Sequence, residues 1–315
     1  MAFSVIEEAN LFPVIRLKDE ENNTEAEIYS FGALINAFTI QQGSFTHNVI
    51  DAFSSPQDAM DNITAGFKSA RLSPFVCRVT KGRYVFSGKE HAINKFFLGT
   101  EAIHGLVFDA QFKVTEKRAD AHGASVTLEH DYIKEEEGFP FNFHSRITYT
   151  LKKPNTLSIA VVITNTGKTD MPLTDGWHPY FTLGGKINEL LFQANTKQML
   201  AFNEYLVPTG GFVEHRLFNS PKHLGETFLD NCFVLDGCEK PACIITNEAT
   251  GLQLIITASK NYPYLQVYTP PHRRSIAVEN LSGAPDAFNN GIGLIIAKPL
   301  EQYTFATDYK LQLSH

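Results

Sequence analysis

The pattern that most limits the fold of this chain lies between residues 147 and 163. Ile147, Tyr149 and Leu151 alternate with polar residues. Beyond the turn-forming segment Lys153-Pro154-Asn155, Leu157, Ile159, Val161 and Ile163 again occupy every second position. A period of two residues places all the apolar side chains on one face of a strand. The segment therefore predicts an antiparallel hairpin with one buried face.

Short apolar runs of the same kind recur along the chain, bounded by Gly, Asn, Asp or Pro. They lie at residues 84–86, 111–115, 126–128, 252–257, 264–268 and 307–313. One short helix is predicted, capped by Ser55 with Pro56 just inside it and running to about Asn62. Helical patterns do not alternate with the strands, and the sequence contains no repeat or linker. We predict an all-β fold, an antiparallel sandwich in which residues 1–315 form a single domain.

Charge and hydropathy exclude several classes of partner. The 27 basic and 34 acidic residues give a net charge of -7, and the basic residues are scattered, so we expect no nucleic-acid partner. No apolar stretch reaches the ~20 residues that cross a bilayer, and charged residues interrupt 1–20, where a signal peptide would lie. We therefore expect a cytoplasmic protein without a membrane partner.

The four cysteines predict free thiols rather than a metal site. Cys77, Cys232, Cys238 and Cys243 form no Cys-x-x-Cys pair, and no histidine lies near them at the spacing of a zinc site. We accordingly expect no structural metal.

The most unusual segment is Thr174-Asp175-Gly176-Trp177-His178-Pro179-Tyr180-Phe181. It holds the only tryptophan of the chain and surrounds His178 with aromatic rings, which could pack against the C–H faces of a sugar. A core histidine at the end of a strand would show the same residue types. Both a core position and a site position are therefore open for His178.

Four further polar residues stand in unusual settings. Glu279 ends an apolar strand, and Arg78 interrupts an apolar run, where an arginine normally needs a partner or a ligand. His104 precedes Gly105, at which the backbone can turn or approach a ligand closely. Asp230 precedes an asparagine, a pair that could equally form a turn. Residue type alone leaves a structural role open for each.

Taken in order, these segments resemble the aldose 1-epimerase (galactose mutarotase) family from about Arg71 to Leu300. The family fold is a single large β-supersandwich, so the resemblance implies that fold. The order of the segments is more specific than any one of them. They are Cys77-Arg78-Val79, Gly82 to Phe86 followed by Gly88-Lys89, His104-Gly105, His178-Pro179-Tyr180-Phe181, Leu229-Asp230 before Phe233, and Glu279 ahead of Pro285-Asp286-Ala287-Phe288-Asn289.

The resemblance implies that Glu279 is the general base and His178 the general acid, and that His104, Arg78 and Asp230 orient the sugar. Interconversion of the α and β anomers of an aldohexose needs a base for the C1 hydroxyl proton and an acid for the ring oxygen, so that the ring opens and recloses. This chemistry requires no metal and no organic cofactor. We expect neither, and a small-molecule sugar as the partner.

Three departures from the family pattern concern sugar preference more than proton transfer. Cys77 replaces the usual Asn, Leu106 follows His104-Gly105 where many members have a second Gly, and Asn280 follows Glu279 where Pro is frequent. The residues able to move protons are all present.

Two alternatives to an aldose mutarotase stay open, a hexose-6-phosphate 1-epimerase and a non-catalytic carbohydrate-binding module of the same fold. A glycoside hydrolase is disfavoured, because its acid and base are two carboxylates. The cluster His272-Arg273-Arg274 could reach a phosphate if its loop curls over the site. However, adjacent arginines in an extended segment point to opposite faces, and a net charge of -7 does not attract a dianion. We therefore predict a neutral free aldose.

Overall fold

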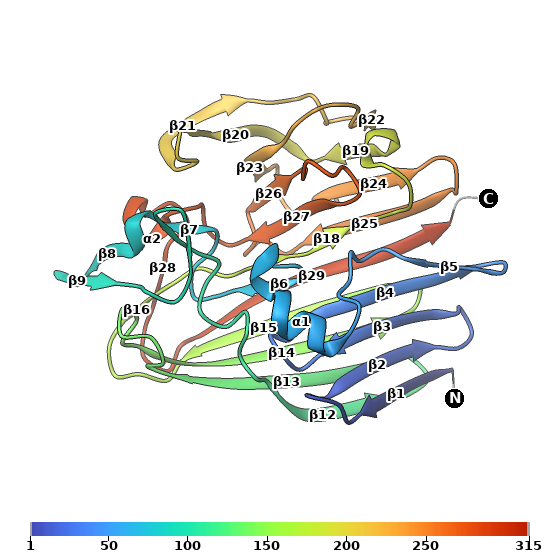
Figure 1. The fold of residues 1–315 in the computed structure, drawn as a ribbon, viewed down its shortest axis with the longest axis horizontal. Helices are drawn as coiled ribbons and strands as arrows, with labels where there is room; N and C mark the ends of the chain where they lie inside the picture. The colour runs from blue at the N-terminus through green and yellow to red at the C-terminus, as the bar shows by residue number, and fades with distance from the viewer. Residues whose placement is uncertain (1, 314–315) are drawn as a thin grey trace.

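The computed structural model describes residues 2–313 and consists mainly of strands, all paired antiparallel (Figure 1). Its largest element is a nine-stranded sheet, in which β29 follows the other eight strands in sequence but lies between β15 and β25. In order across the sheet, the strands are β12 (Lys113–Ala119), β13 (Gly123–Ile133), β14 (Asn142–Lys152), β15 (Thr156–Asn165), β29 (Gln302–Leu313), β25 (Leu252–Ala258), β24 (Cys243–Asn247), β19 (Leu191–Ala194) and β22 (Lys222–His223).

Two further sheets cover this layer, and a bridge between Ile50 and Phe181 joins them. The five-stranded sheet contains β1 (Phe3–Glu8), β2 (Val14–Asp19), β3 (Thr24–Tyr29), β4 (Ile35–Gln42) and β5 (Phe45–Asn48). The eight-stranded sheet runs in the order β21 (Pro208–Glu214), β20 (Thr196–Phe202), β23 (Asp230–Leu235), β26 (Tyr264–Tyr268), β27 (Ile276–Leu281), β17 (Gly176–His178) and β6 (Ala70–Leu72), with β18 (Tyr180–Phe181) paired to β27.

The remaining elements are short and lie in the connections. Small sheets are formed by β10 (Phe97–Leu98), β11 (Glu101–Ile103) and β7 (Arg78–Val79), by β8 (Arg83–Phe86) and β9 (Lys89–Ala92), and by β16 (Met171–Leu173) and β28 (Ile295–Ala297). The helices are α1 (Pro56–Asn62), α2 (Ala287–Asn290) and the 3₁₀ turns η1 (Ile63–Ala65), η2 (Thr80–Gly82) and η3 (Ile187–Glu189).

The predicted hairpin is confirmed as β14 and β15. Tyr149 pairs with Ile159 and Ile147 with Val161, and all four side chains are buried. Thr148 and Ala160, which lie between them, are on the more exposed face. The predicted helix is confirmed as α1, where the Ser55 hydroxyl accepts a hydrogen bond from the Asp58 amide. The run at 111–115 becomes regular strand only from Lys113.

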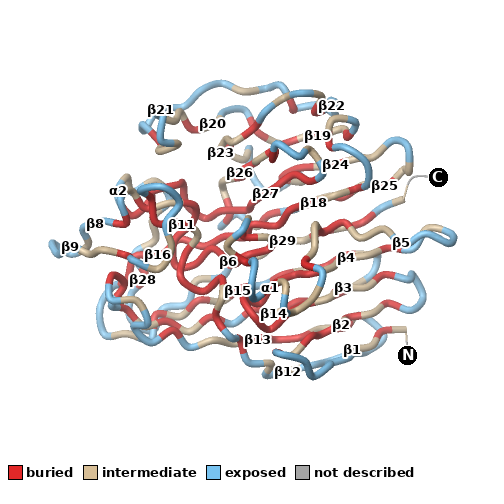
Figure 2. The backbone as a smooth tube through the Cα atoms, viewed as in Figure 1, coloured by how far each residue is buried: buried red, intermediate tan, exposed pale blue. Residues whose placement is uncertain are grey.

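The core lies between the layers. One continuous hydrophobic cluster contains residues from all three large sheets, among them Ile15, Val278 and Tyr309. Figure 2 shows the buried segments concentrated along the strands where the layers meet and the exposed segments in the outer loops. None of the helices within residues 2–313 has the length and apolar character needed to cross a membrane.

Candidate active site

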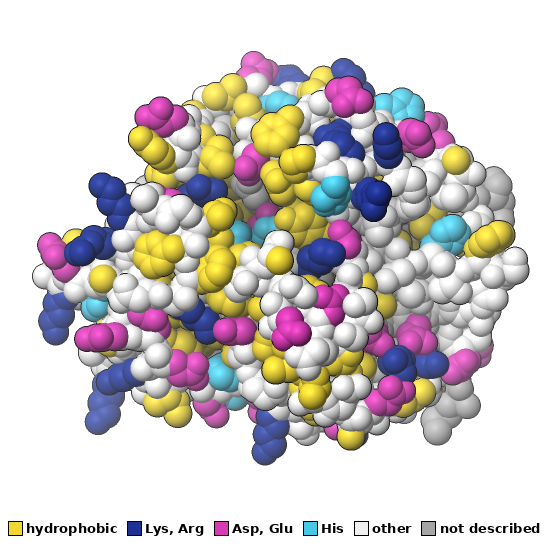
Figure 3. Space-filling model, in the orientation of Figure 1, with side chains coloured by type: hydrophobic (Ala, Val, Ile, Leu, Met, Phe, Trp, Pro, Cys, Tyr) yellow, Lys and Arg dark blue, Asp and Glu magenta, His cyan; other side chains and the backbone are white. Residues whose placement is uncertain are grey.

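A cavity of about 630 Å³ opens beside β23, β26 and β27 of the eight-stranded sheet. Figure 3 shows a hollow near the centre of this face, with histidine and acidic side chains visible in it and hydrophobic side chains around it. All five residues that the sequence predicted for a site line the cavity. They are Arg78, His104, His178, Asp230 and Glu279.

The two residues predicted to transfer protons lie next to one another. Glu279 is on β27 and His178 is the last residue of β17, the strand beside β27 in the sheet. The Nε2 atom of His178 is 3.4 Å from the Oε1 atom of Glu279. Their side chains are 7% and 3% exposed, so both groups are almost completely removed from solvent.

The His104-Gly105 pair forms a tight turn after β11. Both residues have positive φ, 63° for His104 and 78° for Gly105. A Cβ atom on Gly105 would lie 2.5 Å from the carbonyl oxygen of Ser73, so only glycine fits this close approach. The turn directs the His104 ring at His178, with 4.9 Å between the ring centroids. Burial lowers the pKa of His104 well below its ordinary value, and the charges of His178 and Arg78 lower it further.

Arg78 connects the cavity to the hairpin formed by β20 and β21. It begins β7, pairs with Ile103 of β11, and donates from Nη1 to the carbonyl oxygen of Tyr205 at 3.0 Å. Tyr205 lies in the loop between β20 and β21, and its neighbour Leu206 lines the cavity. The Arg78 guanidinium, which the sequence predicted to need a partner, therefore donates to one backbone carbonyl group. Its Nε atom has no hydrogen-bond partner within residues 2–313.

Asp230 is held by a residue that the sequence reading missed. Gln266 of β26 donates from Nε2 to Oδ1 of Asp230 at 2.8 Å, and it lies directly opposite Glu279 in the antiparallel pair of β26 and β27. A polar side chain in the middle of the apolar run 264–268 was the available signal, the same signal that singled out Arg78. Gln266 thus joins the predicted residues in one wall of the cavity.

Burial and neighbouring charge shift the acidities of this group. Burial raises the pKa of Glu279 well above its ordinary value, the charge of Asp230 raises it further, and Arg78 lowers it. Burial lowers the pKa of His178 to about 4. Burial also raises the pKa of Asp230, against the opposing effects of Arg78 and of the hydrogen bond from Gln266. The uncharged forms of Glu279 and His178 are therefore favoured in the cavity.

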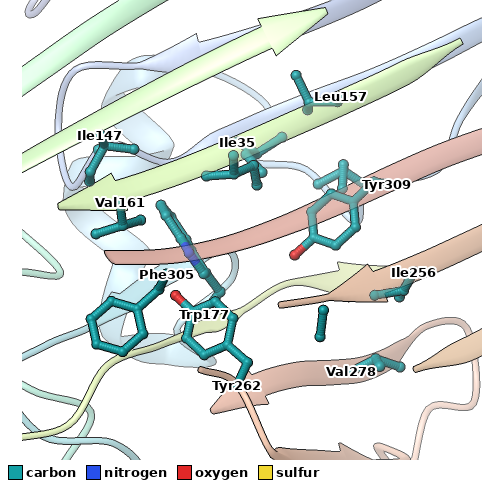
Figure 4. Packing of buried hydrophobic residues seen from close by; sticks show 14 of the residues in the cluster. Ile35, Ile147, Leu157, Val161, Trp177, Ile256, Tyr262, Val278, Phe305 and Tyr309 are labelled. Carbon is teal, nitrogen blue, oxygen red and sulfur yellow. The ribbon is translucent and has the colours of Figure 1, made fainter. Parts of the chain in front are cut away.

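The aromatic residues around His178 divide between the core and the cavity. Trp177 and Phe181 are 1% and 0% exposed and belong to the hydrophobic cluster, in which Figure 4 shows Trp177. Tyr180 lines the cavity, with its ring centroid 5.0 Å from that of His178. Of the three rings, only Tyr180 can contact a bound ligand.

The basic cluster at 272–274 does not converge on the cavity. Arg273 has a positive φ of 56° and its guanidinium donates to Asn188 and to the carbonyl oxygens of Thr227 and Gly225. Neither Arg273 nor Arg274 lines the cavity, whereas His272 does. The segment is a turn rather than the extended chain considered above, and its hydrogen bonds commit Arg273 to the neighbouring loop.

A second cation does line the cavity. The Nζ atom of Lys68 is 2.7 Å from Oδ1 of Asp51, and the other carboxylate oxygen of Asp51 accepts a hydrogen bond from Ser275. Both Lys68 and Asp51 are lining residues. The lysine charge is thus already paired within the wall.

Several buried polar atoms of the cavity residues have no hydrogen-bond partner within residues 2–313. Buried polar groups are normally satisfied, so a group of them around one cavity indicates a polar ligand. The atoms are Nε of Arg78, Nδ1 of His104, Nδ1 of His178, Oε1 of Gln266 and Oε2 of Glu279. In the same part of the chain, no three His, Cys, Asp or Glu side chains are arranged to hold a metal ion.

Comparison with known proteins assigns the chain to a family. The profile of aldose 1-epimerase matches residues 13–310. The chain belongs to the aldose 1-epimerase family. It is 30% identical over 233 residues to the uncharacterized protein YihR of Escherichia coli (strain K12), an alignment that covers 71% of this chain and 73% of YihR.

Solved structures show the fold of this aldose 1-epimerase family member. The GalM/aldose epimerase homologue from C. elegans has a TM-score of 0.82 at 19% identity and covers 100% of both chains. Galactose 1-epimerase from Lactobacillus acidophilus NCFM has a TM-score of 0.83 at 19% identity, and a galactose mutarotase-like protein from Clostridium acetobutylicum has 0.86 at 16%, each covering 99% of both chains. The predicted all-β fold of the galactose mutarotase type is confirmed.

Proposed function

We propose that this protein interconverts the α and β anomers of a free aldohexose. The observation that carries the proposal is the His178–Glu279 pair, 3.4 Å apart and buried in a cavity with unpartnered polar atoms. Anomer exchange needs one base and one acid within reach of the same sugar carbon. A binding module would need neither, so the pair favours a catalyst over a carbohydrate-binding module.

In the proposed reaction Glu279 takes the proton from the C1 hydroxyl while His178 donates a proton to the ring oxygen. The C1–ring oxygen bond breaks as the C1–O1 double bond forms, the aldehyde rotates about C1–C2, and the hydroxyl adds back to its other face. Closure returns both protons by the reverse transfers, so atoms and charge balance over the cycle. Each of the two groups contributes about 10²- to 10⁴-fold to the rate.

The protonation states follow from the shared environment of the pair. Because burial raises the pKa of Glu279 and lowers that of His178, one proton resides on the pair and prefers the carboxyl. Moving that proton to the imidazole produces the carboxylate and imidazolium that the reaction uses, with no change in net charge. The positive charge of Arg78 supports the carboxylate form, since it lowers the pKa of Glu279.

His104, Arg78 and Asp230 orient the sugar in this proposal. Their side chains line the same cavity, and the Asp230 carboxylate is aimed by the amide of Gln266. Orientation of this kind matters because a misplacement of about 1 Å can cost about 10²-fold in rate.

We infer that the substrate carries no phosphate. Arg273 is committed to the loop at 225–227 and Lys68 is paired with Asp51. Arg78 also lines the cavity, but it lies near the carboxyl groups of Asp230 and Glu279, which disfavour a dianion beside it. A single hydrophobic cluster that draws residues from Phe3 to Leu311 supports one domain for the whole chain.

Four unpaired cysteines support action in a reducing compartment, the cytoplasm.

The test is the rate of anomer exchange, followed by polarimetry and by NMR, for a panel of free aldoses and their 6-phosphates. We expect acceleration of at least one free aldose above the spontaneous rate, and its loss in Glu279→Gln. Binding without acceleration of any sugar would favour the non-catalytic module. A kcat/KM for a 6-phosphate more than about ten times that of every free aldose would favour the hexose-6-phosphate epimerase.

A further inference from the structure

A charged cluster lies in the core directly behind the strand that carries His178. Arg71 and Asp175 form an ion pair between Nη2 and Oδ2, and both side chains are 0% exposed. The hydroxyl group of Tyr262 donates to the other oxygen of Asp175 at 2.6 Å. None of these three residues lines the cavity, and the proposed reaction uses none of them.

A buried ion pair of this kind is weak evidence for stability. Removing two charges from water costs several kcal/mol per ion, and apolar residues of the same volume often replace such pairs without loss. The fold therefore does not by itself account for Arg71 and Asp175. A role in holding one conformation is the better explanation, and it depends on what the cluster contacts.

Arg71 binds three consecutive residues of the strand that leads to His178. It pairs with the carboxylate of Asp175, donates from Nη1 to the carbonyl oxygen of Gly176 at 3.2 Å, and stacks on Trp177 with 4.8 Å between the guanidinium carbon and the ring centroid. In the backbone register Trp177 lies opposite Arg71. The Arg71 side chain thus contacts residues 175–177 from the core side of the sheet.

Side chains alternate between the two faces of a strand. Trp177 faces the core, where Arg71 stacks on it, and His178 faces the cavity. Rotation of the strand about its own axis would move both faces together. Gly176 allows β17 to pack closely against β27, because a Cβ atom there would lie 2.5 Å from the Leu281 side chain. The grip of Arg71 therefore fixes the direction in which His178 points.

Within residues 2–313, no side chain other than Glu279 offers the His178 ring a polar partner. Catalytic histidines are commonly oriented by a hydrogen bond from the second ring nitrogen to a carboxylate or carbonyl group. Here Nε2 faces Glu279, and no other residue within 2–313 hydrogen-bonds to the buried Nδ1 atom. The ring must take its direction from its backbone and from packing against His104 and Tyr180.

We propose that Arg71, held by Asp175 and Tyr262 and stacked on Trp177, is the positioning residue that directs His178 at its reacting partner. The expected effect of Arg71 on the reaction rate rests on the proposed function. Its expected effect on the orientation of His178 does not. In a catalytic triad a third side chain orients the histidine directly. Here Arg71, Asp175 and Tyr262 would orient His178 indirectly, through the strand that carries it.

The test uses two variants and one matched control. Arg71→Lys keeps the charge but loses the planar group that contacts three residues, and Tyr262→Phe removes only the hydroxyl group that holds Asp175. The control, Tyr132→Phe, removes one hydrogen bond from an equally buried tyrosine of β13 that does not line the cavity. Each protein is labelled with ¹⁵N-histidine, and the His178 signals are identified by their loss in His178→Asn.

We expect the imidazole ¹⁵N signals of sugar-free His178 to shift or broaden in Arg71→Lys and Tyr262→Phe and to stay unchanged in Tyr132→Phe. At low temperature, kcat should fall by about tenfold or more in Arg71→Lys and by a smaller factor in Tyr262→Phe. In both variants KM should change by less than about threefold.

Unchanged His178 signals in every folded variant would overturn the proposal, even if the melting temperature falls. If Arg71→Lys does not fold, Tyr262→Phe decides by the same measurement. If the wild-type protein turns over no sugar, the proposed function fails, while the histidine signals still decide whether Arg71 positions His178.

Discussion

Gln266 lies directly opposite Glu279 in the antiparallel pair of β26 and β27 and turns its amide toward Asp230 instead. Glu279 consequently keeps one buried oxygen, Oε2, without a partner within residues 2–313. A carboxyl group that the protein leaves unpaired costs stability but is available to a ligand.

Glu279→Gln and His178→Asn should each remove nearly all anomer exchange, because both delete proton transfer. Gln keeps the shape of Glu, and Asn is a smaller polar side chain without the Nε2 atom. The measurement is kcat for the best free aldose, with circular dichroism as the control for folding. Retention of more than about a tenth of the wild-type kcat, a loss below ~1.4 kcal/mol, would contradict the role of that residue.

Glu279→Gln should also stabilise the protein at pH 7. The folded state holds the Glu279 proton to a higher pH than the unfolded state, because burial raises the pKa of this group. The unfolded state therefore binds fewer protons between the ordinary and the raised pKa, and wild-type stability falls as pH rises through this window. Glutamine does not titrate, so we expect a gain of about 1 kcal/mol in the free energy of unfolding at pH 7.

The control for that prediction is the same pair of proteins at pH 4, where Glu279 is protonated in the folded state and mostly protonated in the unfolded state. The gain should largely vanish there. Chemical denaturation at the two pH values measures it, and a gain of equal size at both would mean that the titration of Glu279 is not its origin.

The dependence of kcat/KM on pH should be bell-shaped. Activity requires one proton on the pair, so it falls below about pH 4, where His178 takes up a second proton. It falls again at high pH, once the single proton is lost. Asp230→Asn should move the high-pH limb downward, since the charge of Asp230 raises the pKa of Glu279. An upward movement of that limb would contradict the assignment.

Asp230→Ala and Arg78→Ala should mainly lower kcat/KM through misplacement of the sugar, by about 10- to 100-fold. Arg78→Ala also releases the Tyr205 carbonyl group and frees the loop between β20 and β21. Melting temperature and kinetics at low temperature separate these effects. A large fall in melting temperature with unchanged kinetics would assign Arg78 a structural role.

Arg273→Ala should lower stability without changing the choice between glucose and glucose 6-phosphate. Its guanidinium holds Asn188 and the loop at 225–227, outside the cavity. The ratio of kcat/KM values for the two sugars measures selectivity. Arg274→Ala is the matched control, because Arg274 is exposed and does not line the cavity. Loss of a preference for the phosphate in Arg273→Ala would contradict this interpretation.

The sequence predicted what depends on local pattern. Alternation at 147–163 predicted the hairpin and its buried face, and Ser55-Pro56 predicted α1. The order of the motifs predicted five residues that line one cavity, although they are far apart in the chain.

What the sequence did not predict depends on long-range pairing. The opposition of Gln266 and Glu279 follows from the register of two strands, and the grip of Arg71 on the strand before His178 follows from the pairing of β6 with β17. The hydrogen bonds of Arg273 to the neighbouring loop depend on its positive φ, and two adjacent arginines in a sequence do not indicate such a turn. Register and loop conformation are set by packing across the whole molecule.

The position of β29 has a consequence for synthesis. Until Gln302–Leu313 has left the ribosome, β15 and β25 have no common neighbour, and the nascent nine-stranded sheet exists as two parts with open edges. Open edges pair readily with other chains, and pairings between distant segments form slowly. We expect these two open edges to remain available for pairing with other chains until β29 inserts between them.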